Sequence, residues 1–191
     1  MKRGTYVGWL ALVLGVLALP AVAGTFQQIG LEGLVDTSSA AIEGEVLAVD
    51  SFWDEEGRII LTEATVHVRD KVFGDTAEVV KVRTFGGTVD GYTIDAPGFP
   101  TFAAGERLFL FVSPFKAEGD TLRVTGYQQG QFRIGTGAGK VEVAESALDG
   151  DALLLDLGNE VDLLPRSLPL SELKGLVKTQ ASLKASGTES K

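Results

Sequence analysis

The residue type that most often carries acid–base chemistry near neutral pH is histidine, and this chain contains one, His67. It lies in the alternating run Ile59 to Arg69, where its side chain shares the polar face with Glu63. Two strand residues four positions apart are about 13 Å from each other, which is too far to share a proton or a metal ion. We therefore interpret His67 as a surface residue.

Neither the serines nor a glycine-rich run has the surroundings that catalysis or phosphate binding needs. Ser38, Ser39 and Ser113 lack a G-x-S-x-G setting, and a lone histidine does not support a hydrolase triad. The run Gly135 to Gly139 precedes a strand-like segment rather than a helix, and no Gly-Lys-Ser/Thr closes it. We predict that the protein is not an enzyme.

Two acidic clusters indicate solvated turns rather than metal sites. Asp50 with Asp54 to Glu56 forms one, Asp149 with Asp151 forms the other, and neither has the twelve-residue spacing of a calcium loop. The chain has no cysteine, which excludes disulfides, thiolate zinc sites and cysteine nucleophiles. We predict that the fold holds no metal and no cofactor.

Aromatic residues are the best candidates for a binding site. The segment 86–105 is rich in glycine and proline, and its length is uncommon for a plain connection. It carries Tyr92, Phe99 and Phe102, while Trp53 precedes the acidic turn. Aromatic side chains dominate interface hot spots, but large apolar side chains are also usually buried. Both roles stay open for these four residues: a binding surface, or a plug over one end of the core.

Two long alternating runs, Ala41 to Val49 and Ile59 to Arg69, must position these groups. Their period of two predicts strands with one buried and one exposed face. The acidic turn Asp54 to Gly57 joins them into a hairpin. The second run becomes irregular near Asp70, where a β-bulge would return Val72 to the buried face and bend the strand.

The other apolar segments predict further strands and a final helix. Leu108 to Val112 is apolar throughout, which is typical of a strand buried on both faces. We expect Val66, Val68, Leu110 and Val112 to point into the core. The remaining expected elements are strands over 77–85, 122–126, 131–134 and 140–144, a hairpin from 153–157 and 161–164, a short helix over 31–35, and a helix from 170 onwards.

This order of elements predicts a mainly β fold. We expect an OB-like barrel of five antiparallel strands, with extra strands and a C-terminal helix, and a β-sandwich is the alternative. The long, bulged first strands favour the barrel, because a bent strand can cross both halves of a sheet. The single domain should occupy residues 24–184, and the polar tail, residues 185–191, should be disordered.

The N-terminus has the pattern of an export signal. Lys2 and Arg3 precede the apolar segment Tyr6 to Leu19, and an A-x-A site ends at Ala23. An uncleaved membrane anchor would need roughly 20 apolar residues, more than this segment supplies. We expect residues 1–23 to be a signal peptide that is removed, leaving no stable membrane insertion.

Charge and cysteine content narrow the location and the partners. The formal net charge is −9, and it becomes more negative when Lys2 and Arg3 are removed with the signal. Such a chain repels nucleic acid and anionic lipid, so we expect no nucleic-acid partner. An exported chain without cysteine has neither disulfides nor a cysteine for a lipid anchor. This indicates a soluble protein of the bacterial periplasm or exterior.

Several short motifs resemble known families. They are residues 39–46, the segment 66–74, Gly86-Gly87, Gly105-Glu106 before an aromatic strand, and Gln129-Gly130-Gln131-Phe132. Together they resemble the OB-type barrel of tissue inhibitors of metalloproteinases and netrin-like modules, and a group of uncharacterised exported bacterial proteins. The resemblance covers roughly residues 31–134 and implies fold more than activity. The animal inhibitors coordinate the protease zinc through an N-terminal cysteine, which this chain lacks.

Two functions fit these observations. The first is an exported, non-enzymatic binding protein that recognises another exported protein, such as a protease. Its expected surface joins the aromatic loop, residues 91–104, to the acidic turn, residues 53–57. The alternative is an envelope protein that binds a carbohydrate or another small ligand in the mouth of the barrel.

Overall fold

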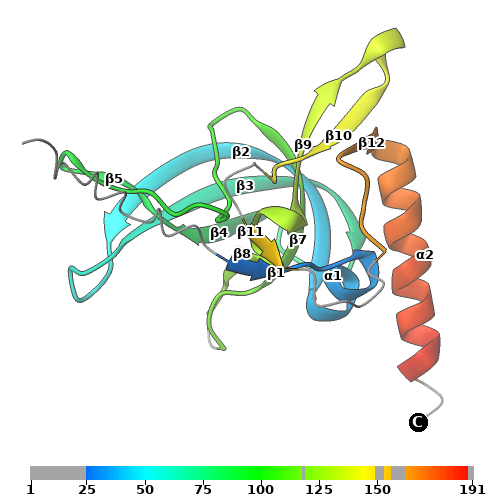
Figure 1. Ribbon diagram of the computed structural model, residues 1–191, viewed down its shortest axis with the longest axis horizontal. Coiled ribbons are helices and arrows are strands. Elements are labelled where there is room, and N and C mark those ends of the chain that lie inside the picture. Colours follow the sequence, from blue (N-terminus) through cyan, green and yellow to red (C-terminus); the bar gives the residue numbers. More distant parts are fainter. Residues whose placement is uncertain (1–24, 118, 149–152, 156–161, 189–191) are drawn as a thin grey trace, which may run out of the picture.

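The computed structural model describes residues 25–117, 119–148, 153–155 and 162–188, so the expected signal peptide, residues 1–23, lies outside the described residues. The fold is mainly β (Figure 1). Its strands are β1 (Thr25–Gln27), β2 (Ala40–Trp53), β3 (Ile60–Phe73), β4 (Val79–Phe85), β5 (Gly87–Val89), β6 (Tyr92–Ile94), β7 (Arg107–Pro114), β8 (Thr121–Val124), β9 (Gln131–Thr136), β10 (Glu142–Ser146), β11 (Leu153–Leu155) and β12 (Ser167–Pro169). The α-helices are α1 (Leu31–Thr37) and α2 (Leu170–Thr188), and the 3-10 helices are η1 (Tyr127–Gly130) and η2 (Ala138–Lys140).

An eight-stranded mixed sheet forms the centre of the molecule and partly closes on itself. Its strand order is β12-β10-β9-β7-β2-β3-β4-β8, and β7 also pairs with β8, so five strands make a ring. The expectation that all five pair antiparallel is wrong, because β4 and β8 pair parallel. A ring with an odd number of strands cannot alternate direction everywhere, so at least one of its pairs must be parallel.

The hairpin of β2 and β3 follows the predicted runs and carries the predicted bulge. Glu43 pairs with Asp70 and Gly44 pairs with Val68, so one residue of β3, Arg69, is extra at this point. A bulge shifts the alternation of a strand by one residue. Val72 is buried as expected, but on the face opposite that of Val68.

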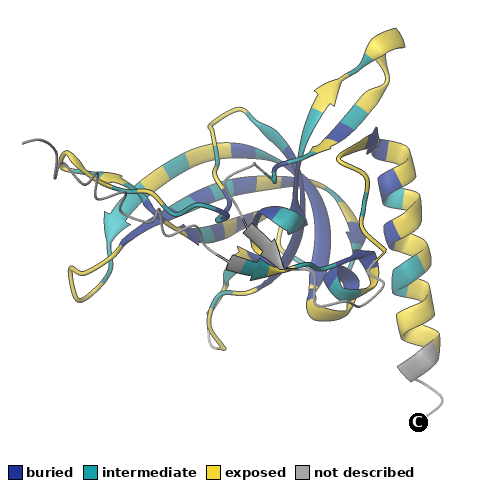
Figure 2. Cartoon of the chain, in the orientation of Figure 1, coloured by how far each residue is buried: buried dark blue, intermediate teal, exposed yellow. Residues whose placement is uncertain are grey.

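The sheet separates two cores, which Figure 2 shows as dark blue bands along the central strands. The ring core contains Ala40, Ile42, Val46, Ala64, Val66, Val68, Val80, Val82, Leu108, Leu110, Val112 and Val124. The helix core, on the other face, contains Leu31, Leu34, Val35, Ala41, Val72, Phe109, Phe111, Phe132, Ala144, Leu168, Leu170, Leu173 and Val177. Alternate residues of β7 enter different cores, which confirms that this strand is buried on both faces. The predicted inward positions of Val66, Val68, Leu110 and Val112 are also confirmed.

Two pairings differ from the sequence prediction. β11 pairs parallel with β1, and residues 162–164 are not in a strand, so the expected hairpin does not form in the described part of 153–164. Residues 156–161 lie outside the described residues. Within the expected loop, 86–105, strands β5 and β6 form a small hairpin. Asp90 and Gly91 both have positive φ, 50° and 81°, as a tight Asp-Gly hairpin turn requires.

Helix α2 covers one side of the sheet (Figure 1). Leu173 and Val177 are four residues apart and fully buried, which is the spacing of one helical face. The helix continues to Thr188, past the end expected at residue 184. Lys184 holds its last turns to α1, because its Nζ donates to the carbonyl oxygens of Val35 and Asp36, both at 2.9 Å. No helix in the described ranges is both long and apolar enough to span a bilayer.

A group of ion pairs fastens α2 to the sheet. Lys174 donates to Glu43 at 2.6 Å and to Asp70 at 2.7 Å, and Arg107 bridges Glu43 and Glu142. Burial alone would raise the pKa of Glu43, but hydrogen bonds from Lys174 and Arg107 and their positive charges hold it below its ordinary value of 4.5. The carboxylate therefore stabilises the folded state while it is ionised.

We expect Lys174→Met to lower the free energy of unfolding by about 1–3 kcal/mol at neutral pH, because Glu43 loses one of its two cationic partners. A carboxyl whose folded pKa is depressed contributes stability above its unfolded pKa and loses it as pH falls through the folded value. The gap between the two proteins should therefore shrink below the ordinary pKa of 4.5. Urea unfolding across this pH range measures it. Exposed Lys116→Met is the control without effect, and a gap independent of pH would contradict the account.

Candidate binding site

The structure places the four expected binding residues in three locations. Trp53 and Tyr92 meet at the far end of the β2–β3 hairpin, with ring centroids 6.0 Å apart, and Tyr92 is 66% exposed. Phe99 lies in a separate cluster of rings. Phe102 packs against the ring core. The expected loop therefore combines a core plug with aromatic rings in two other places.

Five rings from five separate segments form what we call the aromatic cluster: Phe26, Phe85, Phe99, Phe115 and Tyr127. Phe99 is at its centre, with centroids 5.8 Å from Phe26, 5.2 Å from Phe85 and 4.9 Å from Tyr127. Phe115 contacts Phe85 at 6.4 Å. These separations are typical of edge-to-face and tilted aromatic contacts. The cluster joins β1, β4 and η1 to the loop after β6 and to the turn after β7.

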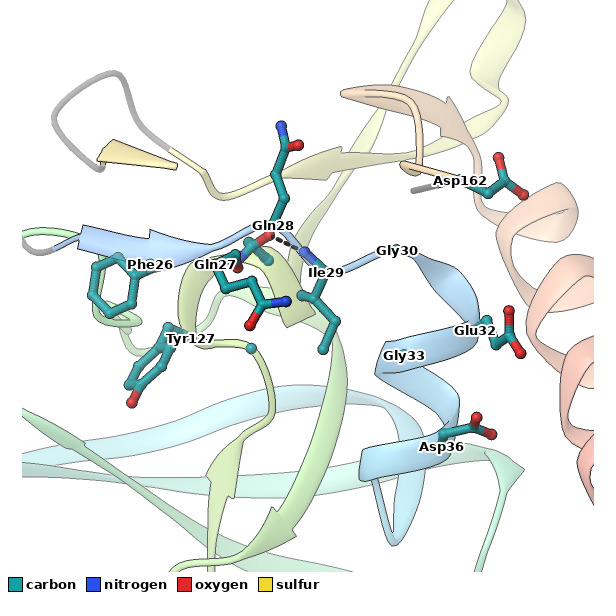
Figure 3. Close-up of a pocket in the computed structure, with 12 residues that line it drawn as sticks. Phe26, Gln27, Gln28, Ile29, Gly30, Glu32, Gly33, Asp36, Tyr127 and Asp162 are labelled. Atoms are coloured by element: carbon teal, nitrogen blue, oxygen red, sulfur yellow. Dashed lines mark hydrogen bonds between the residues drawn. The ribbon is translucent and has the colours of Figure 1, made fainter. Parts of the chain in front are cut away.

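Backbone features on both sides hold the cluster in place. Gly98 has φ 82°, and a Cβ on it would approach the Phe26 ring to 2.1 Å, so only glycine fits there. On the other side, Gln129 clamps the segment that carries Phe26. Its Oε1 accepts from the Ile29 backbone N–H at 3.0 Å, the contact drawn in Figure 3, and its Nε2 donates to the Gln27 carbonyl at 3.0 Å.

Tyr127 is the residue on which the surrounding cavities converge. It has φ 58°, a left-handed conformation that is unusual for a bulky side chain, and it follows Gly126 with φ 70°. Such backbone strain persists only where the surroundings fix it, and it is concentrated at functional sites. Tyr127 lines one cavity of about 630 Å³ and two of about 220 Å³.

We call one of the two smaller cavities the arginine cleft. Its walls include Arg83, Phe85, Phe99, Phe115, Arg123 and Tyr127. Both arginines enter it from the parallel pair of strands that closes the ring, β4 and β8. The cleft therefore combines aromatic walls with two positive charges, in a chain whose overall charge is negative.

The two arginines of the cleft differ in their partners. Arg83 donates to Glu63 through Nη2 at 2.6 Å and Nε at 3.2 Å, and its guanidinium lies 5.3 Å from the centroid of Phe115. Burial alone would raise the pKa of Glu63, but hydrogen bonds from Lys81 and Arg83 hold it below its ordinary value. Arg83 thus faces an ionised carboxylate.

Arg123 has no such counter-ion. Its Nε donates to the Ser113 hydroxyl at 3.3 Å, and no carboxylate of the described residues lies within ion-pair distance. Another polar group of the cleft is unsatisfied: Thr84 is 5% exposed, and its buried hydroxyl has no hydrogen-bond partner among the described residues. Buried polar groups without partners are rare and call for an explanation. A ligand that supplies an anion would satisfy the charge of Arg123.

The cavity of about 630 Å³, which we call the acidic cavity, lies on the other side of Tyr127. Figure 3 shows Phe26 and Tyr127 together at one side of it, and Glu32, Asp36 and Asp162 at the other. Among the described residues that line it, none has a basic side chain. The surface around Tyr127 therefore changes from positive in the arginine cleft to negative in the acidic cavity.

Sequence reasoning identified one residue of the cleft, Phe99, and missed the rest. Arg83 and Phe85 have the alternation of one face of a strand, which was a readable signal, but nothing local links them to Arg123 or Tyr127. His67 is exposed on β3, where the sequence places it, and pairs in register with Glu45. Across the residues that the structure describes, no three His, Cys, Asp or Glu side chains gather closely enough to hold a metal ion.

Comparisons with known proteins assign no family to this chain. No protein-family model matches this chain. No curated protein and no solved structure matches it either.

Proposed function

We propose that this protein is an exported, non-enzymatic binding module that recognises another exported protein, such as a protease, through the arginine cleft. The observation that carries the proposal is the cleft itself, in which aromatic walls and Arg123 line one cavity, and Arg123 is a cation without a carboxylate partner among the described residues. Aromatic residues and arginine are the types most enriched in interface hot spots. Hot spots lie in pockets that lose their water when the partner binds, and the aromatic walls line a cleft of about 220 Å³ that a partner side chain can fill.

The fold supports the same location. We take the five-stranded ring to be an OB-like barrel, related to the barrel of metalloproteinase inhibitors and netrin-like modules. OB-folds bind ligands over the face of their second and third strands and through two loops, one of which joins the fourth and fifth strands. The fourth and fifth ring strands in chain order are β7 and β8. The turn between them carries Phe115, which lines the cleft.

The volumes favour a protein partner over a small ligand in the cleft. Sites for drug-sized molecules occupy about 300–1,000 Å³, whereas the arginine cleft holds about 220 Å³. That space suits one side chain of a partner. The acidic cavity, at about 630 Å³, is the observation that favours the second candidate function. It has room for a carbohydrate unit, with the rings of Phe26 and Tyr127 as a stacking surface and glutamines as hydrogen-bonding groups.

The test is capture of the partner by residues 24–191 from the exported fraction of the cells that make the protein. We compare the wild type with Phe115→Ala and Arg123→Glu in the cleft, and with Tyr92→Ala at the end of the hairpin. We expect the cleft variants to retain at least about tenfold less partner, and Tyr92→Ala to retain all of it. Circular dichroism checks that each variant is folded.

Two outcomes would overturn the proposal. Equal capture by wild type, Phe115→Ala and Arg123→Glu would mean that the cleft is not the interface. Loss of capture in Tyr92→Ala alone would move the interface to the Trp53–Tyr92 pair and the acidic turn.

A further inference from the structure

We infer that the arginine cleft binds the carboxyl-terminal residue of a partner protein, and that this residue has a large apolar or aromatic side chain. The inference rests on the proposed function and adds the chemistry of the ligand. It follows from three properties of the cleft: its size, its single available cation, and the closeness of that cation to the aromatic walls.

The size of the cleft limits what enters it. About 220 Å³ accommodates one large side chain, and Phe85, Phe99, Phe115 and Tyr127 offer ring faces and edges against which such a side chain packs. Two of these rings, Phe85 and Tyr127, are 39% and 40% exposed, so a ligand that packs against them removes apolar surface from water. A polar side chain would bring little of this gain.

The available cation limits the charge of the ligand. Arg83 is occupied by Glu63 and stacked against Phe115, which leaves Arg123 as the donor for an incoming anion. Its Nε bond to Ser113, 3.3 Å long, occupies one edge of the guanidinium. The two terminal nitrogens can then donate to both oxygens of a carboxylate, which is the geometry that arginine favours. One available arginine can neutralise one carboxylate of the ligand.

A nucleic acid does not fit this arrangement. Protein affinity for nucleic acid comes mainly from many phosphate contacts by lysine and arginine. Here one arginine is available, and the chain as a whole has a formal net charge of −9. The aromatic walls alone would offer stacking without the charge that holds a phosphate backbone.

The closeness of Arg123 to the aromatic walls favours the carboxyl terminus of a partner chain over an internal residue. Arg123 and the aromatic walls line the same small cavity, so the carboxylate and the apolar side chain must sit side by side. An internal Asp or Glu brings its carboxylate on its own side chain, and the apolar group then needs a second side chain in the same space. Within a protein chain, only the carboxyl-terminal residue carries a carboxylate and an apolar side chain on one Cα.

The test measures fluorescence anisotropy of N-terminally labelled heptapeptides with residues 24–191. One peptide ends in Phe as a free acid, the second is its carboxyl-terminal amide, and the third is an amide with Asp at the penultimate position. We expect the free acid to bind at least about tenfold more tightly than either amide. Arg123→Gln should abolish the preference for the acid, whereas Lys116→Gln, which changes an exposed charge of the neighbouring turn, should keep it.

Equal binding of the free acid and its amide would overturn the inference, as would a preference for the acid that survives Arg123→Gln. Tighter binding of the peptide with internal Asp would assign the site to acidic side chains instead. These results are separable from the fate of the proposed function. Capture that depends on the cleft, together with no binding of any peptide, rejects the terminal residue and keeps the interface. Capture that is unchanged in the cleft variants rejects the cleft as the interface.

Discussion

The variant Val66→Asp is expected to lower the free energy of unfolding by several kcal/mol. Val66 is fully buried in the ring core, between β2 and β4, where it pairs with Val46 on one side and Val80 on the other. A carboxylate placed there would be buried without a partner, at a cost of several kcal/mol. Whole domains are stable by only about 5–15 kcal/mol, so this cost removes most of the margin.

The control for this variant is the neighbouring residue. Thr65 is half-buried on the opposite face of β3, and its partner in register on β4 is Lys81. A carboxylate at position 65 would face that lysine across the strands, so Thr65→Asp should change stability by less than about 1 kcal/mol. Circular dichroism with urea unfolding measures both. Similar damage from the two variants would mean that the faces of β3 are assigned the wrong way round.

The variant Phe109→Ala is expected to lower the free energy of unfolding by about 3–5 kcal/mol. Phe109 is fully buried in the helix core, with ring centroids 5.5 Å from Phe111 and 6.5 Å from Phe132. Truncation removes the transfer free energy of the ring and leaves a cavity that the rigid strands around it cannot fill. The helix core depends on this contact, because the two flanking rings then lose a shared neighbour.

A phenylalanine outside the cores gives the matched control. Phe85 is 39% exposed in the wall of the arginine cleft, and its replacement by alanine should cost about 1 kcal/mol or less. Urea unfolding followed by tryptophan fluorescence compares the two variants. If Phe109→Ala cost no more than Phe85→Ala, the helix core would not be a principal source of stability.

Strand faces were predictable from the sequence wherever the alternation is unbroken. Val66 and Val68 point inward as their period indicates, and the wholly apolar β7 is buried on both sides. The same logic fails at Val72, because the bulge at Arg69 moves the residues beyond it to the other face. A sequence shows that a bulge is needed, but a shift by one residue decides which core the following residue enters.

The pairings between distant segments were the main features of the fold that the sequence did not predict. The parallel contact of β4 with β8 and that of β1 with β11 join segments that share no local signal. The hairpin of β5 and β6 was different, since Asp90-Gly91 between a β-branched and an aromatic residue is a readable hairpin signal. It was hidden within a segment whose many glycines and prolines suggest an irregular loop.

The candidate site was also hard to predict, because its residues are distant from one another in the sequence. Phe99 was predicted from its place in the glycine-rich segment, but its partners come from elements far apart in the chain. Arg83 reaches the cleft on β4, Arg123 on β8 and Tyr127 on η1. Only the closure of the ring brings these three together. Arg123 is identified as the available cation of the cleft only once the structure shows that Arg83 is paired with Glu63.

Hydrogen–deuterium exchange of the protein with and without its captured partner tests whether the arginine cleft is the binding surface. We expect slower exchange over residues 83–85 and 113–127, which carry walls of the cleft, and unchanged exchange over 53–57 and 90–94. Slower exchange confined to 53–57 and 90–94 would contradict it and place the interface at the Trp53–Tyr92 end of the hairpin.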